Sequence, residues 1–270
     1  MTAVSQREWP FGDLLRQWRE RRRMSQLALA VEAEISSRHL SFVETGRSVP
    51  SRELVLHLAE QLELPLRERN QLLLAAGYAP IYQETPLDQP QMAEVRAAVR
   101  LVLTAHEPYP AVVVDRAWNL LDANASVAIF TDPVAPELLE PPANALRVTL
   151  HPQGMAPHIV NLGEWRAHLL ARLRRQVALT ADSVLARLLD ELRAYPCDQP
   201  EPDVELPGPG DVFVPLRVRH EGRVLTFFST IATFGTPLDI TLAELAIESF
   251  FPADRETADL LTEGPRWERR

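Results

Sequence analysis

Residues 24–51 constrain the fold of this chain most, because they predict two short helices joined by a tight turn. Ser25 is suited to cap the first helix, in which Leu27, Ala30 and Val31 share one apolar face. The small side chain of Ala30 lets a second helix cross close to the backbone of the first. The segment therefore predicts a helix-turn-helix.

The second helix of this pair begins at Ser36 or Ser37 and has two different faces. Leu40 and Val43, three residues apart, are expected to point inward. The opposite face is rich in hydrogen-bond donors and free of bulky apolar groups, which suits the major groove of DNA. It is formed by Ser37, Arg38, Ser41 and Thr45.

Three side chains of this segment have expected roles on DNA. Arg38 is the expected base reader, since an arginine can bond two acceptors of guanine. Gly46 ends the helix in a position that favours positive φ, which places Arg47 to meet a phosphate, and Gln26 is expected to hold another. The alternative is that these side chains form an ordinary solvated helix face.

Residues Phe11 to Ala79 contain four short motifs: Met24-Ser25-Gln26, Ile35-Ser36, Glu44-x-Gly46-Arg47 and Pro50-Ser51. With these motifs the segment resembles the lambda-repressor-like, xenobiotic-response-element family of bacterial regulators. One departure is Glu34, where many relatives carry a glycine in the turn. The resemblance implies an all-α, five-helix DNA-binding domain over residues 1–79. Helical spacing in the first helix leaves Arg16 or Arg19 free to pair with Glu44.

The distribution of charge agrees with a DNA-binding N-terminal domain, although the whole chain carries a net charge of −9. Residues 1–78 have a net charge of +1 and residues 79–270 a net charge of −10. Within residues 36–52, Arg38, Arg47 and Arg52 oppose only Glu44. The expected DNA face is therefore locally positive, and the acidity belongs to the second domain.

The second domain is expected over residues 91–270, after a proline-punctuated linker at 80–90. Apolar spacing predicts helices over 91–106, 123–130, 143–150, 162–179 and 181–194. Apolar runs and alternation predict strands over 111–114, 118–122, 212–219, 223–234 and 241–250. Strands at both ends with helices between them predict an α+β domain with an antiparallel sheet.

Residues Glu94 to Asp259 contain a second set of markers: Trp118-Asn119 with Asn124, Leu150-His151-Pro152-x-Gly154, Asn161, Phe234-Gly235-Thr236-Pro237-x-Asp239 and Glu248-x-x-x-Pro252-Ala253-Asp254. Together they resemble the MmyB-like ligand-binding domain, which is similar in fold to PAS sensors. In that family this domain follows a helix-turn-helix of the same type. The resemblance implies that the second domain senses a small molecule.

A sensor pocket between sheet and helices is expected to be mainly apolar with few polar anchors. An elongated apolar ligand such as a fatty acid fits this composition, with Arg147 or Arg217 meeting its carboxylate. The alternative is that the same aromatic residues simply form the core. The candidate ligand residues are Val114, Trp118, Phe130, Arg147, Trp165, Phe213, Phe228 and Thr230.

Other classes of protein find little support in the sequence. His151, His158 and His168 lack a cysteine or second acidic cluster that would complete a metal site, so no metal is expected. Neither a nucleophile elbow, a phosphate-binding glycine loop nor a zinc-protease motif is present, and Cys197 has no obvious base, so catalysis is not expected. No apolar run approaches the ~18 residues of a membrane span, and no signal-peptide core is seen, which predicts a cytoplasmic protein.

Together these patterns predict a transcription regulator that binds a palindromic operator in double-stranded DNA as a homodimer and senses a small apolar ligand without any other cofactor. The competing hypothesis is that the second domain is a protein-interaction or dimerisation module that binds no small molecule.

Overall fold

The computed structural model describes residues 11–202 and 214–262, which form two compact units. The first unit contains the described residues up to Thr85 together with Thr236–Ala243, and the second contains Pro86–Gly235 and the described residues from Glu244 onward. The linker expected at 80–90 is therefore divided between the units. The assignment of 236–243 to the first unit was not foreseen from the order of the chain.

The first unit begins with five short helices, and three of them start at a serine that caps the helix. Ser25, Ser36 and Ser51 each accept a hydrogen bond on the side-chain oxygen from the backbone N–H three residues later, at 3.0, 3.1 and 3.2 Å. The helices are α1 (Phe11–Arg21), α2 (Gln26–Glu32), α3 (Ser37–Glu44), α4 (Arg52–Gln61) and α5 (Leu66–Ala75). This arrangement confirms the predicted all-α domain.

The core of the five helices shows how α3 is held. Leu40 and Val43 of α3 are buried, as the sequence predicts. The predicted apolar face of α2 is wrong, because Leu27 and Val31 are 64% and 67% exposed. The helix packs instead through Leu29, Ala30 and Ala33, which are all buried, because it is rotated so that these positions face the core.

Two backbone positions set the turns on either side of α3. Glu34 has a φ of 50°, so it adopts the left-handed conformation for which relatives are expected to use glycine. Gly46 has a φ of 71° directly after the end of α3. The turn between α2 and α3 thus forms without a glycine.

The second unit contains an antiparallel sheet with the strand order β2-β1-β5-β4-β3. The two longest strands are neighbours in this sheet, and in their antiparallel pairing Thr230 lies opposite Ser249. The strands are β1 (Ala111–Val114), β2 (Leu120–Ala123), β3 (Leu216–His220), β4 (Arg223–Thr233) and β5 (Ala246–Pro252). The α+β prediction is confirmed.

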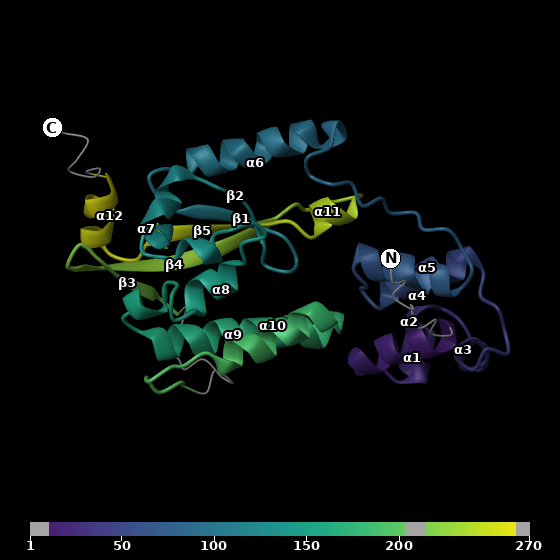
Figure 1. Ribbon diagram of the computed structural model, residues 1–270. Helices are drawn as coiled ribbons and strands as arrows, with labels where there is room; N and C mark the ends of the chain where they lie inside the picture. Colours follow the sequence, from purple (N-terminus) through teal and green to yellow (C-terminus); the bar gives the residue numbers. More distant parts are fainter. Residues whose placement is uncertain (1–10, 203–213, 263–270) are drawn as a thin grey trace. The chain divides into compact units, whose positions relative to one another are not determined.

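Helices cover both faces of this sheet (Figure 1). On one face α6 (Ala93–Ala105) packs on Ala111 and Val113 of β1, whereas Val112 and Val114 face the larger core on the other side. Because successive side chains of a strand alternate, a strand covered on both faces is apolar throughout. The larger core is closed by α7 (Ala128–Thr131), α8 (Ala145–Leu150), α9 (Leu162–Thr180) and α10 (Ser183–Ala194).

Short elements complete the chain. The single-turn 3₁₀ helices are η1 (Pro90–Met92), η2 (Ala125–Val127), η3 (Pro136–Leu138) and η4 (Ala156–His158). The helix α12 (Arg255–Thr262) packs against β4 and β5.

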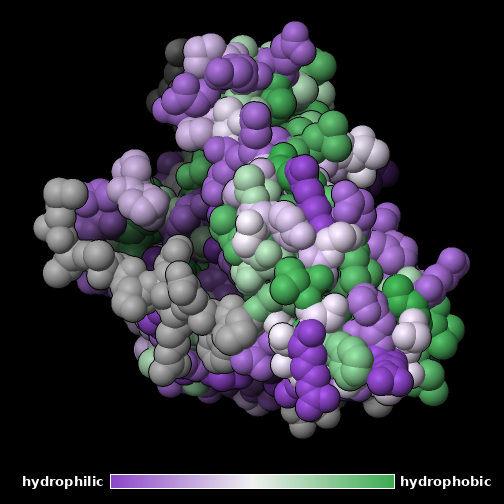
Figure 2. Space-filling model, turned by 90° about the vertical axis from the view of Figure 1, so that its right-hand side faces the viewer, coloured by the Kyte–Doolittle hydropathy of each residue, from purple (hydrophilic) through white to green (hydrophobic). Residues whose placement is uncertain are grey.

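On the face shown in Figure 2, hydrophobic and hydrophilic residues are interspersed.

The predicted strand over 241–250 is wrong in its first half. A single helical turn, α11 (Ile240–Ala243), occupies that part, and β5 begins only at Ala246. The carboxylate of Asp239 accepts a hydrogen bond from the backbone N–H of Thr241 at 2.8 Å, which satisfies an amide at the start of the turn. Local capping has therefore overridden the apolar–polar alternation.

Candidate DNA interface and ligand cavity

The candidate DNA interface is the outer face of α3. Ser37, Arg38, Thr45 and Arg47 are exposed and Ser41 is half-buried. The hydroxyl of Thr45 donates to the carbonyl oxygen of Ser41 at 2.7 Å. The structure thus places these five predicted residues together on one helix and the turn that follows it, and their contact with DNA stays a prediction.

An aromatic ring that the sequence analysis did not single out lies beneath two of the arginines. The guanidinium carbons of Arg38 and Arg47 are 5.3 and 5.9 Å from the ring centre of Phe42. Such cation–π contacts restrict long side chains that otherwise move freely. Phe42 therefore positions the expected base reader and an expected phosphate contact relative to each other.

A buried carboxylate anchors the inner side of α3. Glu44 is 2% exposed, and its two oxygens accept hydrogen bonds from Nε and Nη2 of Arg19 at 2.6 and 3.0 Å. Gln26 donates to the same carboxylate at 2.7 Å, and Nε of Arg16 lies 3.5 Å away. The pairing of Glu44 with Arg19 agrees with the sequence prediction, and the position of Gln26 links the start of α2 to the end of α3.

The protonation of Glu44 follows from these partners. Burial acts to raise the pKa of Glu44, but hydrogen bonds from Arg19 and Gln26 and the charges of Arg19 and Arg16 outweigh it and lower the pKa below its ordinary value. The carboxylate therefore remains ionised and its charge is compensated inside the domain. The exposed face keeps the positive charges of Arg38 and Arg47.

The close approach of α1 to α3 requires a glycine. A Cβ atom added at Gly12 would lie 2.2 Å from the carbonyl oxygen of Glu44. Since backbone cannot yield as a flexible side chain does, a larger residue here would push the two helices apart. Gly12 and the Arg19–Glu44 pair together fix the position of the recognition helix α3.

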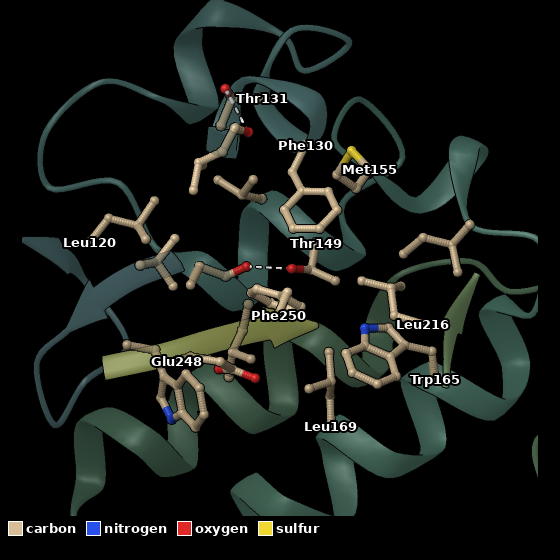
Figure 3. A pocket seen from close by; sticks show the side chains of 17 residues that line it. Leu120, Phe130, Thr131, Thr149, Met155, Trp165, Leu169, Leu216, Glu248 and Phe250 are labelled. Carbon is tan, nitrogen blue, oxygen red and sulfur yellow. Dashed lines mark hydrogen bonds between the residues drawn. The ribbon is translucent and has the colours of Figure 1, made fainter. Parts of the chain in front are cut away.

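The second unit encloses a cavity of about 70 Å³ between the sheet and its helices (Figure 3). Its walls come from β1, β2, β3, β5, α7, α8 and α9, and they are mainly apolar. The larger lining side chains are Trp118, Leu120, Phe130, Met155, Trp165, Leu169, Leu216 and Phe250.

Few polar groups line this cavity. Among the described lining residues Glu248 alone is charged, and it is 7% exposed. The indole N–H of Trp165 is buried without a hydrogen-bond partner among the described residues. The hydroxyl of Thr149 donates to the carbonyl oxygen of Ala145 at 2.7 Å (Figure 3). A buried donor without an acceptor is costly, so the Trp165 N–H is a ready anchor for a bound molecule.

Glu248 is connected to a second layer of polar groups. Nη1 of Arg172 lies 3.6 Å from Oε2 of Glu248, and the guanidinium carbon is 4.2 Å from the ring centre of Trp118. The indole N–H of Trp118 donates to Oε1 of Gln176 at 2.8 Å. Burial lowers the pKa of Arg172. The charge of Glu248 and a hydrogen bond to it act in the opposite direction but do not outweigh burial. An ordered polar network therefore lies behind Glu248 and Trp118, outside the lining of the cavity.

The structure brings together only part of the predicted ligand set. Trp118, Phe130 and Trp165 line the cavity, whereas Phe213 lies outside the described residues. Val114, Phe228 and Thr230 do not line it, because Val114 packs in the core, Phe228 stacks on Phe251 at 5.2 Å and Thr230 is exposed.

The two arginines that were expected to meet a ligand carboxylate lie elsewhere. Arg147 is paired with Glu191, with Nε–Oε1 and Nη2–Oε2 distances of 2.7 and 2.8 Å, and does not line the cavity. Arg217 is an exposed residue of β3. Neither arginine is therefore placed by the structure to meet a ligand carboxylate in this cavity.

The described residues hold no group of three or more metal-ligating side chains. Within the same residues, no helix is both long and apolar enough to cross a membrane.

His168 stacks on Trp165 at 5.4 Å, and its pKa is lowered by burial and by the charges of Arg172 and Arg175.

A helix-turn-helix unit joined to a unit with an apolar cavity defines a transcription regulator with a DNA-binding and a ligand-binding domain. Comparison with known families agrees: residues 10–72 match a helix-turn-helix domain, and residues 95–263 match the MmyB-like transcription regulator ligand binding domain. The second match covers more than half of the chain, so the chain belongs to the MmyB-like transcription regulator family. Neither matched family is a family of enzymes.

Other comparisons add little. No curated protein matches the chain. A solved structure described as an RNA-binding light-oxygen-voltage receptor is 13% identical, with a TM-score of 0.30. The alignment covers 97% of this chain and 63% of that one, so the chain spans less than two thirds of that protein.

Proposed function

We propose that this regulator binds a palindromic operator as a homodimer in the cytoplasm, and that a small apolar ligand in the cavity changes its affinity for DNA. The observation that carries the proposal is the pairing, in one chain, of an arginine-bearing recognition helix with a cavity in which the indole N–H of Trp165 lacks a partner among the described residues.

For DNA binding, the support comes from the side chains that α3 and the following turn expose. Arg38 is suited to read a guanine, because its guanidinium matches the two acceptors of that base, and Arg47 is suited to a phosphate. Phe42 holds both guanidinium groups near one ring. A two-fold dimer doubles these contacts and reads two half-sites about 10 base pairs apart.

For the ligand, the cavity favours an apolar body with one hydrogen-bond acceptor. The acceptor takes the N–H of Trp165, and the body contacts the aromatic and aliphatic walls. A fatty acid or fatty alcohol has this chemistry. The volume of about 70 Å³ is below the ~150 Å³ that holds benzene in an engineered cavity, so an extended chain binds only by displacing the walls.

The test of DNA reading is selection of binding sites from random duplex DNA at a stated salt concentration, with the native protein and with Arg38→Ala. The expected result is a two-fold symmetric motif whose preference at one position in each half-site relaxes in the variant. Failure of the native protein to enrich any motif, both alone and with added ligand, would contradict sequence-specific DNA binding.

The test of the cavity uses decanoic acid and 1-decanol as probes of thermal unfolding and of binding by native mass spectrometry. We expect binding to the native protein and roughly 5- to 30-fold weaker binding to Trp165→Phe, which keeps an aromatic ring but lacks the donor. The matched control is Phe228→Leu, at a residue outside the cavity. If neither probe binds and solvent extraction of the purified protein releases no apolar molecule, the interaction-module hypothesis is favoured instead.

A further inference from the structure

The connection between β4 and β5 belongs to a different unit from the strands that it joins. Both strands are part of the sheet of the second unit, but Thr236–Ala243 is part of the first unit with the DNA-binding helices. This connection contains most of the Phe234-to-Asp239 motif, which neither the DNA interface nor the cavity uses. We call residues 236–243 the latch segment.

Hydrogen bonds fasten the latch segment to the chain that follows α5. The carboxylate of Asp239 accepts hydrogen bonds from the hydroxyl of Thr85 at 2.6 Å and from its backbone N–H at 3.2 Å. The N–H of Ile240 donates to the carbonyl oxygen of Gln83 at 2.8 Å. Ile240 is 3% exposed, whereas its neighbour Leu238 is 83% exposed. The segment is therefore seated through Asp239 and Ile240.

The residues that receive the latch segment are themselves held by α5. Oδ1 of Asn70 accepts hydrogen bonds from the backbone N–H groups of Ile81 and Tyr82 at 3.1 and 3.2 Å. Its Nδ2 donates to the carbonyl oxygen of Tyr82 at 2.7 Å, and the residue is 9% exposed. A continuous set of hydrogen bonds thus runs from α5 through 81–85 to the latch segment.

At its other end the latch segment leads directly into a wall of the cavity. Glu248 and Phe250 of β5 line the cavity, and Leu245 and Ile247 pack in the cluster under α6. A shift of β5 along or across the sheet must therefore be taken up in the short chain between Ala243 and Ala246. Since a ligand larger than the cavity displaces its walls, the latch segment lies where such a displacement reaches the first unit.

We propose that the latch segment couples ligand occupancy of the cavity to the DNA-binding unit, through the bonds between Asp239 and Thr85. This inference rests on the proposed ligand site. A bound ligand moves β5, which changes the strength of these bonds and so the freedom of the DNA-binding unit relative to the sheet. Without the bonds, ligand and DNA bind independently.

Whether hydrogen bonds hold the latch segment against residues 83–85 is tested first, without ligand, by hydrogen exchange of the full chain. The backbone amides of Thr85 and Ile240 are expected to be protected in the native protein and in Leu238→Ala, the matched control. In Asp239→Ala both amides are expected to lose protection. Thr85→Val removes only the hydroxyl bond and leaves the cap of α11 intact, so a smaller loss is expected. Free exchange of both amides in the native protein would overturn the proposal.

The coupling is tested by measuring operator affinity with and without decanoic acid as the probe. In the native protein and Leu238→Ala, decanoic acid is expected to change operator affinity by a factor within the 5- to 150-fold range typical of allosteric coupling. In Asp239→Ala the factor is expected to fall toward one, and in Thr85→Val it is expected to fall by less, while decanoic acid binds both variants with unchanged affinity. The same factor in Asp239→Ala as in the native protein would overturn the proposed coupling through the latch segment. Failure of the native protein to bind decanoic acid would instead overturn the proposed ligand site.

Discussion

At the scale of single residues, the recognition helix depends on one buried ion pair. Arg19 and Glu44 form a two-fold hydrogen-bonded pair, whereas Arg16 is 40% exposed and contacts the same carboxylate at 3.5 Å. Arg19→Ala leaves a buried carboxylate without its main partner, so we expect the free energy of unfolding to fall by about 3–5 kcal/mol. Arg16→Ala is the control, with an expected loss below about 1 kcal/mol. Urea unfolding measures both, and equal losses would show that the pair is not specific.

The same carboxylate gives stability a dependence on pH. The pKa of Glu44 is lower in the folded protein than its ordinary value. A lowered pKa contributes stability that is present above the unfolded-state pKa and is lost as the pH falls through the folded-state pKa. The difference in unfolding free energy between the native protein and Glu44→Gln is therefore expected to be greatest near neutral pH and to shrink on acidification. A difference that grows in acid would contradict the assigned pKa direction.

A second carboxylate sets the charge preference of the cavity. Glu248 faces the cavity and shares Arg172 with the network behind it. Removing its negative charge makes an anionic ligand less unfavourable and changes little for a neutral one. In Glu248→Gln we expect the ratio of decanoic acid to 1-decanol affinity to rise about tenfold, which corresponds to about 1.4 kcal/mol. Titration calorimetry with both probes measures this ratio, and an unchanged ratio would place the ligand headgroup away from Glu248.

At the scale of elements, the proposed binding of α3 to DNA depends on Phe42 to position the two arginines. Phe42 lies within 5.3 and 5.9 Å of the guanidinium carbons of Arg38 and Arg47. Two exposed cation–π contacts contribute about 0.5–1 kcal/mol each, so Phe42→Leu is expected to weaken operator binding roughly 5- to 30-fold. Fluorescence anisotropy at fixed salt measures this, and helix content by circular dichroism shows that α3 is retained. Val49→Ala, at a residue 81% exposed near the same turn, is expected to change affinity less than twofold.

Elements whose signals are local were predicted well from the sequence, and those that depend on packing were not. The cap at Ser25, the serines at 36 and 37 and the apolar spacing located α2 and α3 within a few residues. The inward face of α2 was predicted wrongly, because spacing alone does not fix how a short helix is rotated against its neighbours. The alternation over 241–250 hid α11, which depends on the carboxylate of Asp239.

The candidate sites divide in the same way. The DNA face follows from a contiguous motif, so its residues fall together on α3 and the next turn. The cavity is assembled from strands and helices distant in the chain, and the face of each strand that turns inward depends on which helices cover it. Glu248 was missed as a lining residue for this reason, and Arg147 was proposed although it pairs with Glu191.

At the scale of the whole molecule, the chain is not divided into two consecutive segments. The latch segment returns from the sheet to the DNA-binding unit, so the connection between the units includes both the chain around Thr85 and residues 236–243. A single linker would leave the DNA-binding unit free to move as a tethered body. In the proposed coupling a second connection restricts that freedom, so that the two binding sites can influence each other.

The proposed dimer makes a geometric demand on its operator. Two recognition helices related by two-fold symmetry meet the same face of DNA only if the half-site centres are about one helical turn, roughly 10 base pairs, apart. Insertion of about half a turn between the half-sites rotates one of them to the opposite face, so we expect affinity to fall to that of a single half-site. Anisotropy titrations with the selected operator and its lengthened form, at equal salt, measure the change. Equal affinities for the two operators would show that the protein reads each half-site as an independent monomer.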